Sequence, residues 1–237
     1  MAYYFVQDSQ QESQPKISGT ETIHLIIGLS LVIFIFSYPM GEINPLKAMQ
    51  NLRFTGKHGA FYRALLIAPA FLLHEFGHKF TARAYKNWSE FRLSPVSVVS
   101  MLILLFVTMG FGKMAAPGAV VVYGMHVTTS RTGVIAIAGP SVNICLALFA
   151  ALLSKYYLDP GDMQDFMLYF FLVNFALATF NLLPFGPLDG RKIIRWSPIA
   201  WVLAFSINFG IFWFAIDTAF EGSFIDLDLG GMSDILN

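Results

Sequence analysis

Long apolar stretches separated by short polar segments make up most of this chain. A helix needs about 20 mostly apolar residues to cross a bilayer, and five stretches are of about that length. They are residues 23–40, 61–83, 132–153, 166–188 and 197–216. Pro69 is expected to kink the second stretch, and Gly139-Pro140 is expected to interrupt the third. The pattern predicts an α-helical polytopic membrane protein with five to six transmembrane helices.

The segment 93–128 breaks the helical pattern. Its first half is apolar, but residues 115–125 are rich in β-branched side chains and interrupted by proline and glycine, which favours extended chain. Extended backbone at membrane depth is tolerated only where it is buried in protein or lines a wet cavity. We therefore predict a re-entrant or β-ribbon element in this segment, beside the candidate site described below. Its centre would be the valine run Val120, Val121 and Val122.

Composition supports a membrane protein. Of the 237 residues, 56% are hydrophobic and 13% are charged, whereas a soluble domain carries about 25% charged residues. The formal net charge is zero, which argues against nucleic acid as a partner. The lone cysteine, Cys145, excludes an internal disulfide and a cysteine-rich zinc site. The lipid bilayer is therefore an expected partner of this chain.

Polar segments flank the apolar region. Residues 1–22 are rich in Gln and Ser, and residues 220–237 are acidic. No basic segment precedes the first apolar run and no small-residue cleavage site follows it, so no cleaved signal peptide is predicted. We expect a polar N-terminal tail (1–22), a single membrane-embedded domain (23–219) and an acidic C-terminal tail (220–237).

The basic residues predict an orientation. Arg191, Lys192 and Arg195 precede the last apolar stretch, and no Lys or Arg follows it. Cytoplasmic loops are enriched in Lys and Arg, so the last span should run from inside to outside and the acidic loop 154–165 should lie outside. The segment 41–63 also carries four basic residues, so the rule does not decide the orientation of the second span.

The strongest chemical signal is the pattern His74-Glu75-Phe76-Gly77-His78 in the second apolar stretch. Residues four apart on an α-helix are separated by about 400°, so both histidines face the same side and can reach one metal ion. Glu75 lies about 100° round from His74, near enough to address a metal-bound water without being a ligand. A charge at the centre of a membrane helix costs roughly 2.5–3.5 kcal/mol, which argues against a chance pattern.

A catalytic zinc site usually has three protein ligands and one open position, so a third ligand must come from elsewhere. Asp189, like His74, lies within a few residues of a basic side chain. Both groups should therefore lie at a similar depth, near the cytoplasmic face, which makes Asp189 a reasonable third ligand. A turn carboxylate in Pro-Leu-Asp-Gly is the alternative for Asp189, and His126 is the second candidate ligand. His24 and His58 are expected to be interfacial or solvated.

Three motifs together resemble one protein family. HEFGH at 74–78, AGPSVN at 138–143 and NLLPFGPLDG at 181–190 are similar to motifs of the site-2 protease family of intramembrane zinc metalloproteases. The resemblance covers about residues 60–195. It implies that His74, His78 and Asp189 bind one zinc ion per chain and that Glu75 acts as the general base on zinc-activated water.

The same resemblance implies supporting residues. Gly139, Pro140 and Asn143 match the GPxxN motif of the family, whose asparagine is implied in positioning the substrate or stabilising the oxyanion. Asn181 matches a position near the LDG motif. This chain would be a compact member, because the loop 154–165 leaves no room for a PDZ domain and no nucleotide-sensing domain follows residue 220.

The function implied is cleavage of transmembrane protein substrates within the membrane. A substrate helix must unwind locally before it can be cut, and the valine run could hold the unwound chain as an added strand. Two other classes remain. A metal-binding membrane transporter would not need Glu75 and would tend to repeat its ligand set. A non-proteolytic membrane scaffold would be expected to have lost Glu75 or a ligand.

Overall fold

The computed structural model describes residues 17–38, 60–109, 116–123, 128–159, 161–186 and 188–220. Its elements are α1 (Gly19–Ser37), α3 (Ala60–Ala84), β1 (Trp88–Leu93), α4 (Pro95–Val107), β2 (Gly118–Tyr123), α5 (Thr129–Tyr157), α6 (Asp162–Asn181), α7 (Asp189–Trp196) and α8 (Pro198–Phe220). The expectations for most of the two tails and for the segment 41–59 fall outside these residues.

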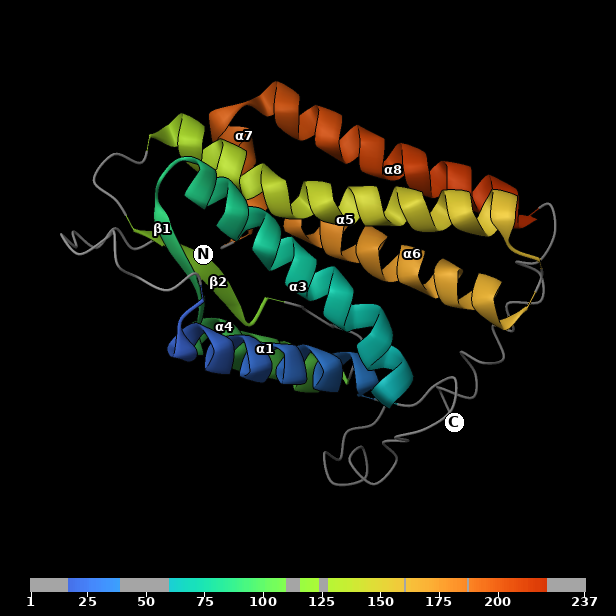
Figure 1. The fold of residues 1–237 in the computed structure, drawn as a ribbon, viewed down its shortest axis with the longest axis horizontal. Coiled ribbons are helices and arrows are strands. Elements are labelled where there is room, and N and C mark those ends of the chain that lie inside the picture. The colour runs from blue at the N-terminus through green and yellow to red at the C-terminus, as the bar shows by residue number, and fades with distance from the viewer. Residues whose placement is uncertain are drawn as a thin grey trace.

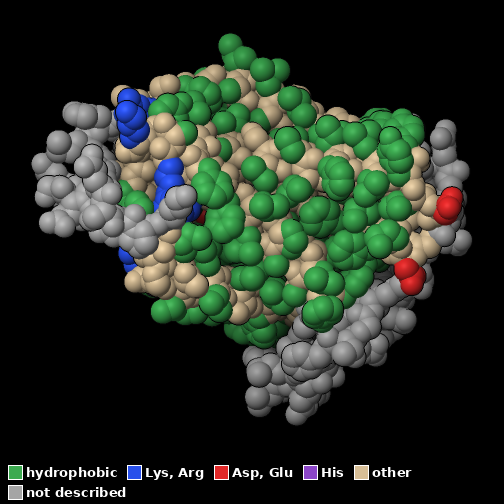
Figure 2. Space-filling model, in the orientation of Figure 1, with side chains coloured by type: hydrophobic (Ala, Val, Ile, Leu, Met, Phe, Trp, Pro, Cys, Tyr) green, Lys and Arg blue, Asp and Glu red, His purple; other side chains and the backbone are tan. Residues whose placement is uncertain are grey.

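Four of the described helices, α1, α5, α6 and α8, are long and apolar enough to cross a membrane. Figure 2 shows apolar side chains over most of one face, with Lys and Arg gathered at one end and Asp and Glu at the opposite end. The described chain is thus mostly helical, with apolar helices of spanning length and a small antiparallel hairpin. This confirms the predicted fold class except for the number of spans.

The helices form two groups with α3 between them (Figure 1). α5, α6 and α8 run side by side, and the largest buried cluster packs small side chains of α5, such as Ala147, against Phe170 and Phe171 of α6. On the other side, α1 packs on α3 through Val32 and Phe71. α3 therefore contacts both groups, so its side chains lie in the interior, where they can form a buried site.

The β-ribbon lies at the C-terminal end of α3. β1 and β2 pair antiparallel, with Glu90 opposite Val121. The position of the ribbon differs in part from the prediction, because β1 precedes the segment 93–128 and only β2 lies within it. Between the strands, α4 has 13 residues, which is too short for a span of about 20. The sequence WSEFRL of β1 alternates polar and apolar residues only over its last four positions, and its pairing with β2 makes all six residues a strand.

Three boundaries differ from the sequence prediction. α5 runs without interruption through Gly139-Pro140, since neighbouring helices can accommodate a proline inside a transmembrane helix. α5 and α6 extend into the expected loop 154–165, so that 158–161 alone connect them. The basic segment after Leu188 forms the short helix α7, which buries Ile193 and exposes Arg191 and Arg195.

A buried ion pair ties α1 to α3. Lys79 donates to Glu21, and both side chains are only 1% exposed. The other oxygen of Glu21 accepts the backbone N–H of Phe91 at 3.0 Å, and the Leu93 N–H donates to His24 Nδ1 at 3.4 Å. His24, expected to be interfacial or solvated, therefore contacts β1. α1 begins at Gly19, four residues before the predicted span, which brings Glu21 into its first turn.

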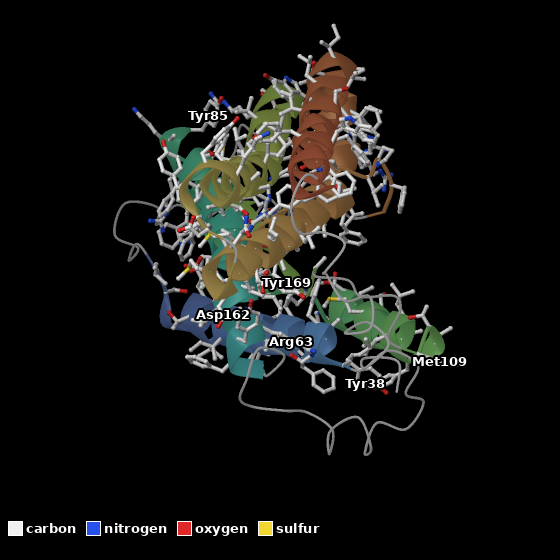
Figure 3. All side chains as sticks on the ribbon, turned by 90° about the vertical axis from the view of Figure 1, so that its right-hand side faces the viewer. Tyr38, Arg63, Tyr85, Met109, Asp162 and Tyr169 are labelled. Atoms are coloured by element: carbon white, nitrogen blue, oxygen red, sulfur yellow. The ribbon has the colours of Figure 1, made fainter. Side chains whose placement is uncertain are left out.

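The opposite end of α1 is held by a weaker contact. Arg63 Nη1, near the start of α3, donates to the carbonyl of Phe36 at 3.5 Å. Figure 3 shows Arg63 in this region, where the ends of α1 and α3 meet. The ion pair at Glu21 is thus the principal polar link between α1 and the rest of the described structure.

Removal of Glu21 should strongly destabilise this fold. Glu21→Ala leaves the Lys79 ammonium buried without its partner, and breaking a buried pair in this way costs about 3–5 kcal/mol. We expect a clearly lower midpoint of thermal unfolding for the detergent-solubilised protein. The double variant Glu21→Gln/Lys79→Met removes both charges and should recover much of the loss. A single variant as stable as the wild type would contradict the proposed importance of this pair.

Candidate metal centre

The HEFGH motif lies in the C-terminal half of α3, and the helix brings its two histidines together. His74 and His78 are one turn apart, are only 5% and 4% exposed, and pack edge to face with ring centroids 4.7 Å apart. Their Nε2 atoms face each other at 3.1 Å. The helical spacing read from the sequence therefore places two ring nitrogens at one point.

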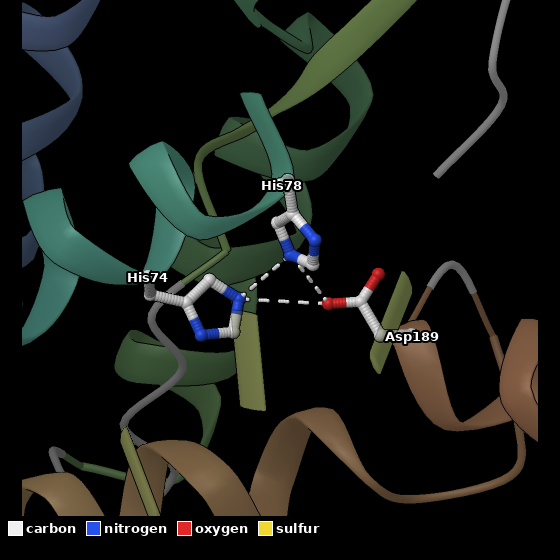
Figure 4. A group of neighbouring side chains, drawn as sticks. All are labelled: His74, His78 and Asp189. Carbon is white, nitrogen blue, oxygen red and sulfur yellow. Dashed lines mark hydrogen bonds and ion pairs between the residues drawn. The ribbon is translucent and has the colours of Figure 1, made fainter. Parts of the chain in front are cut away.

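Asp189 reaches the same point from the first turn of α7 (Figure 4). Its Oδ2 atom lies 3.0 Å from His78 Nε2 and 3.5 Å from His74 Nε2. Gly190 makes this approach possible, because a Cβ atom there would collide with the carbonyl oxygen of Leu182 at the end of α6. The Asp-Gly pair thus lets the first turn of α7 lie directly against the end of α6.

Each of the three side chains is held by a second contact on its far side. His78 Nδ1 is 2.7 Å from the carbonyl oxygen of Ile135, and a carbonyl only accepts, so Nδ1 of this ring carries the proton. His74 Nδ1 is 2.6 Å from Asn143 Oδ1, which likewise accepts. Lys192 donates to Asp189 Oδ1 at 2.8 Å and leaves Oδ2 directed at the rings.

These contacts leave three electron-pair donors facing one another. With the proton on Nδ1 of each neutral ring, both Nε2 atoms present a lone pair, and Asp189 Oδ2 is an acceptor too. The three atoms lie within 4.8 Å of one another. A cation relieves this mutual repulsion, and two imidazole nitrogens with one carboxylate oxygen form a usual donor set for catalytic zinc. The residues therefore fit a metal ion.

Glu75 is buried beside this group. It is 7% exposed, and its Oε2 atom has no hydrogen-bond partner among the described residues. A buried carboxylate oxygen is costly unless it accepts a hydrogen bond, and a bound water can donate one. Glu75 is thus available to a water at the metal centre.

Gly139 of α5 borders the ring nitrogens directly. A Cβ atom at this position would overlap His78 Nε2 and would lie 2.7 Å from His74 Nε2. Glycine is therefore required where α5 crosses the metal-facing side of the rings. Pro140 follows it inside the continuous helix and is buried.

Asn143 lies behind His74 and away from the ring nitrogens that face the metal. It is fully buried, and its two Nδ2 hydrogens have two acceptors, the carbonyl of Ala70 at 3.0 Å and Asn174 Oδ1 at 2.9 Å. The oxyanion contact implied by the family resemblance therefore has no hydrogen left to donate. The structure instead places this amide as the support of the His74 ring.

The remaining predicted residues lie at different distances from the centre. Asn181 ends α6, where its Nδ2 donates to the carbonyl of Leu177 at 3.0 Å. Val120 and Val122 in β2 pack against Ala82, one turn beyond His78, and against Ile135. Val121 lies between them in the same strand. His58 and His126 lie outside the described residues.

Two contacts of the centre were not predicted from the sequence. The carbonyl of Ile135 has no side-chain signature, so its role could not be inferred. Lys192 was assigned only to a basic loop, and its i, i+3 spacing to Asp189 became informative once α7 proved to be helical. The i, i+3 rule would have found this contact if a helix had been predicted there.

Comparison with known proteins identifies relatives of one kind. A protein of Methanocaldococcus jannaschii named "Putative zinc metalloprotease MJ0611" is 34% identical over 190 residues, which cover 79% of this chain and 90% of the relative. "Putative zinc metalloprotease Rip2" of Mycobacterium tuberculosis is 28% identical over 72% of this chain and 67% of its own length. "Putative zinc metalloprotease sll0528" of Synechocystis is 29% identical over 62% of this chain and 34% of its own length.

No family model matches the chain, and no solved structure matches it. These relatives are all named as zinc metalloproteases, and the alignment with the Methanocaldococcus jannaschii protein covers most of both chains. Together with the cluster of His74, His78 and Asp189, they confirm zinc as the predicted cofactor. The chain belongs to the site-2 protease-like family of zinc metalloproteases.

Proposed function

We propose that this protein is an intramembrane zinc metalloprotease that cleaves transmembrane segments of membrane proteins. The observation that carries the proposal is a buried set of three metal-binding atoms with a carboxylate beside it, inside a bundle of apolar helices. A soluble protease would not need an apolar exterior, and a membrane protein without catalysis would not need Glu75 buried without a partner.

Five membrane crossings and a cytoplasmic position of the site accompany this proposal. α3 has 25 residues, about 37 Å of helix, and packs between helices of spanning length. Its ionisable side chains at the metal centre keep it from being as apolar as the others. α7, which carries Asp189, lies at the end where Lys and Arg gather (Figures 1 and 2), and positive charge marks the cytoplasmic side. Water then needs to pass only a short distance to reach Glu75.

The chemistry follows from the positions of these groups. Zinc, when bound by His74, His78 and Asp189, supplies a Lewis acid that polarises the scissile carbonyl and makes water more acidic. Glu75 accepts a proton from the attacking water and passes it to the departing amine nitrogen, so that the peptide bond breaks into an acid and an amine. Lys192 holds Asp189 by its other oxygen and keeps one oxygen for the metal.

The hairpin offers a place for an unwound substrate. The backbone N–H of Ser94 donates to the carbonyl of Pro117, which makes these two opposite residues a hydrogen-bonded pair. Such pairs alternate along an antiparallel ladder, so residues 118, 120 and 122 of β2 direct their N–H and C=O groups away from β1. The outer edge of β1 is occupied by Glu21 and His24 of α1. Among the described residues, no hydrogen bond joins the backbone of Val120 or Val122 at the outer edge of β2. An extended substrate segment can add as a strand at that edge.

Two observations favour proteolysis over the alternatives. A transporter tends to repeat its ligand set, and the described residues contain a single cluster suited to a metal ion. A scaffold without catalysis has no use for a buried general base, and Glu75 is present next to its metal ligands. Substrates and the bilayer are therefore the proposed partners, with no role for nucleic acid.

Replacement of Glu75 by glutamine should abolish most cleavage while leaving zinc in place. Glutamine cannot take the proton from water, and general base catalysis contributes about 10²–10⁴-fold. We expect cleavage of a purified single-span membrane substrate by Glu75→Gln to fall by this range in detergent or liposomes. Zinc per chain, measured by atomic absorption, should match that of the wild type.

Asp159→Asn is the matched control for that variant. It removes a carboxylate that is exposed at the end opposite the metal centre, and its cleavage rate should equal that of the wild type. Removal of zinc with a chelator should stop cleavage in the wild type, and added zinc should restore it. Cleavage by Glu75→Gln at the wild-type rate would exclude the proposed mechanism.

Gly139→Ala should weaken zinc binding. The added methyl group overlaps the ring nitrogens that face the metal, and overpacking of this kind costs about 1–3 kcal/mol. We expect the dissociation constant for zinc, measured by competition with a chromophoric chelator, to rise about tenfold or more. Gly210→Ala in α8 is the control, since nothing lies within 4 Å of a Cβ atom there. Equal zinc affinity of both variants would contradict the geometry at Gly139.

Proline in the outer edge of β2 should impair cleavage without loss of zinc. Val120→Pro removes an outward N–H, and a hydrogen bond contributes about 0.5–1.5 kcal/mol, so kcat/KM should fall about 2- to 10-fold. The double variant Val120→Pro/Val122→Pro should lose more. Val120→Ala keeps the backbone amide and is the control. If the double variant retained zinc and cleaved as well as the wild type, the substrate would not add at this edge.

A further inference from the structure

A buried chain of hydrogen bonds leads from the middle of α6 to the ring of His74. Asn174 Nδ2 donates to the carbonyl of Phe170 at 2.8 Å, and Asn174 Oδ1 accepts from Asn143 Nδ2 at 2.9 Å. Asn143 Oδ1 then faces His74 Nδ1 at 2.6 Å. Both asparagines are fully buried, so water does not compete for these groups.

The direction of this chain is set at its far end. The carbonyl of Phe170 can only accept, so the group of Asn174 that faces it must be the NH₂ group. The oxygen of Asn174 therefore faces Asn143 and requires a donor there. The carbonyl of Ala70, 3.0 Å from Asn143 Nδ2, requires a donor at the same place. Two acceptors thus fix the NH₂ group of Asn143 on one side and its oxygen on the side of His74.

This orientation decides which nitrogen of His74 carries the proton. The Asn143 oxygen accepts, so the proton lies on Nδ1 and the lone pair lies on Nε2, where the metal binds. A reversed Asn143 would offer N–H to Nδ1 and set its oxygen against two other oxygens. The ring proton would then move to Nε2, 3.1 Å from His78 Nε2, and block the metal.

We propose that Asn174 is a positioning residue of the metal centre, which acts through Asn143 to hold the lone pair of His74 Nε2 toward the metal. Asn174 is the one strongly polar residue in the run Tyr169–Ala178, and a polar side chain buried between transmembrane helices is costly unless its partners are in place. The proposal rests on the metal centre of the proposed function and does not depend on proteolysis.

Zinc affinity of the full chain in detergent tests this proposal. Asn174→Leu removes the acceptor that holds Asn143, and loss of an outer contact of a metal ligand typically costs 10- to 100-fold in metal affinity. Because Ala70 still holds Asn143, we expect the lower part of that range, about tenfold. Asn143→Leu should weaken zinc binding at least as much. The double variant should be no weaker than Asn143→Leu alone, because Asn174 acts through Asn143.

Asn208→Leu is the matched control. Asn208 of α8 is 1% exposed and links to α6 by donating to Thr179 Oγ1 at 2.7 Å, but it has no contact with the metal ligands. It should lose stability in thermal unfolding without a change in zinc affinity. The visible absorption spectrum of the cobalt-substituted protein should change in Asn174→Leu and stay unchanged in Asn208→Leu, which a merely structural role of Asn174 would not produce.

Asn174→Asp provides a second test if Asn174→Leu does not fold. In its protonated form the carboxyl keeps an oxygen facing Asn143 and an O–H that can donate to the carbonyl of Phe170, so the variant should bind zinc within about threefold of the wild type. Each of four results would overturn the proposal. Two concern the leucine variants: wild-type zinc affinity in Asn174→Leu, or equal weakening in Asn208→Leu. The other two are additive losses of zinc affinity in the double variant and tenfold weaker zinc binding in Asn174→Asp. A wild-type chain that binds no zinc would instead overturn the proposed function.

Discussion

Three electron-pair donors meet in the interior of this protein, and much of the surrounding structure serves to hold them there. Two imidazole nitrogens of α3 and a carboxylate oxygen of α7 repel one another until a cation is bound. Each is turned toward the centre by a contact on its opposite side. The centre is therefore defined as much by these outer hydrogen bonds as by the ligands.

Close approach of backbones is the second requirement. Gly139 lets α5 pass directly over the two rings, and Gly190 lets α7 begin against the end of α6. Near the start of α5, Gly133 likewise leaves room for the side chain of Trp196 in α7. Small residues at helix contacts are usual in membranes, where association depends on packing and not on the hydrophobic effect. Here they also bring ligands from separate helices within reach of one metal ion.

The hairpin lies between α1 and the metal centre and contacts both. Glu21 and His24 accept hydrogen bonds from the outer edge of β1, so the outer edge of β2 is the one to which a further strand could pair. β2 packs on Ile135, whose carbonyl holds His78. Under the proposed function, a substrate strand added to β2 would therefore lie against the residue that fixes a metal ligand.

The sequence by itself determined what depends on local spacing. The lengths of the apolar stretches predicted helices, and the four-residue interval of His74 and His78 predicted a shared face, because helical periodicity needs no knowledge of the rest of the chain. The tertiary structure decided what depends on partners. β1 forms a strand by pairing with β2, and α7 begins where it packs against the end of α6. The hydrogen bonds of Asn143 to Ala70, Asn174 and His74 define its role. A buried polar group takes whichever hydrogen-bond partner the packing of distant helices provides, and the spacing of residues along the sequence does not determine that packing.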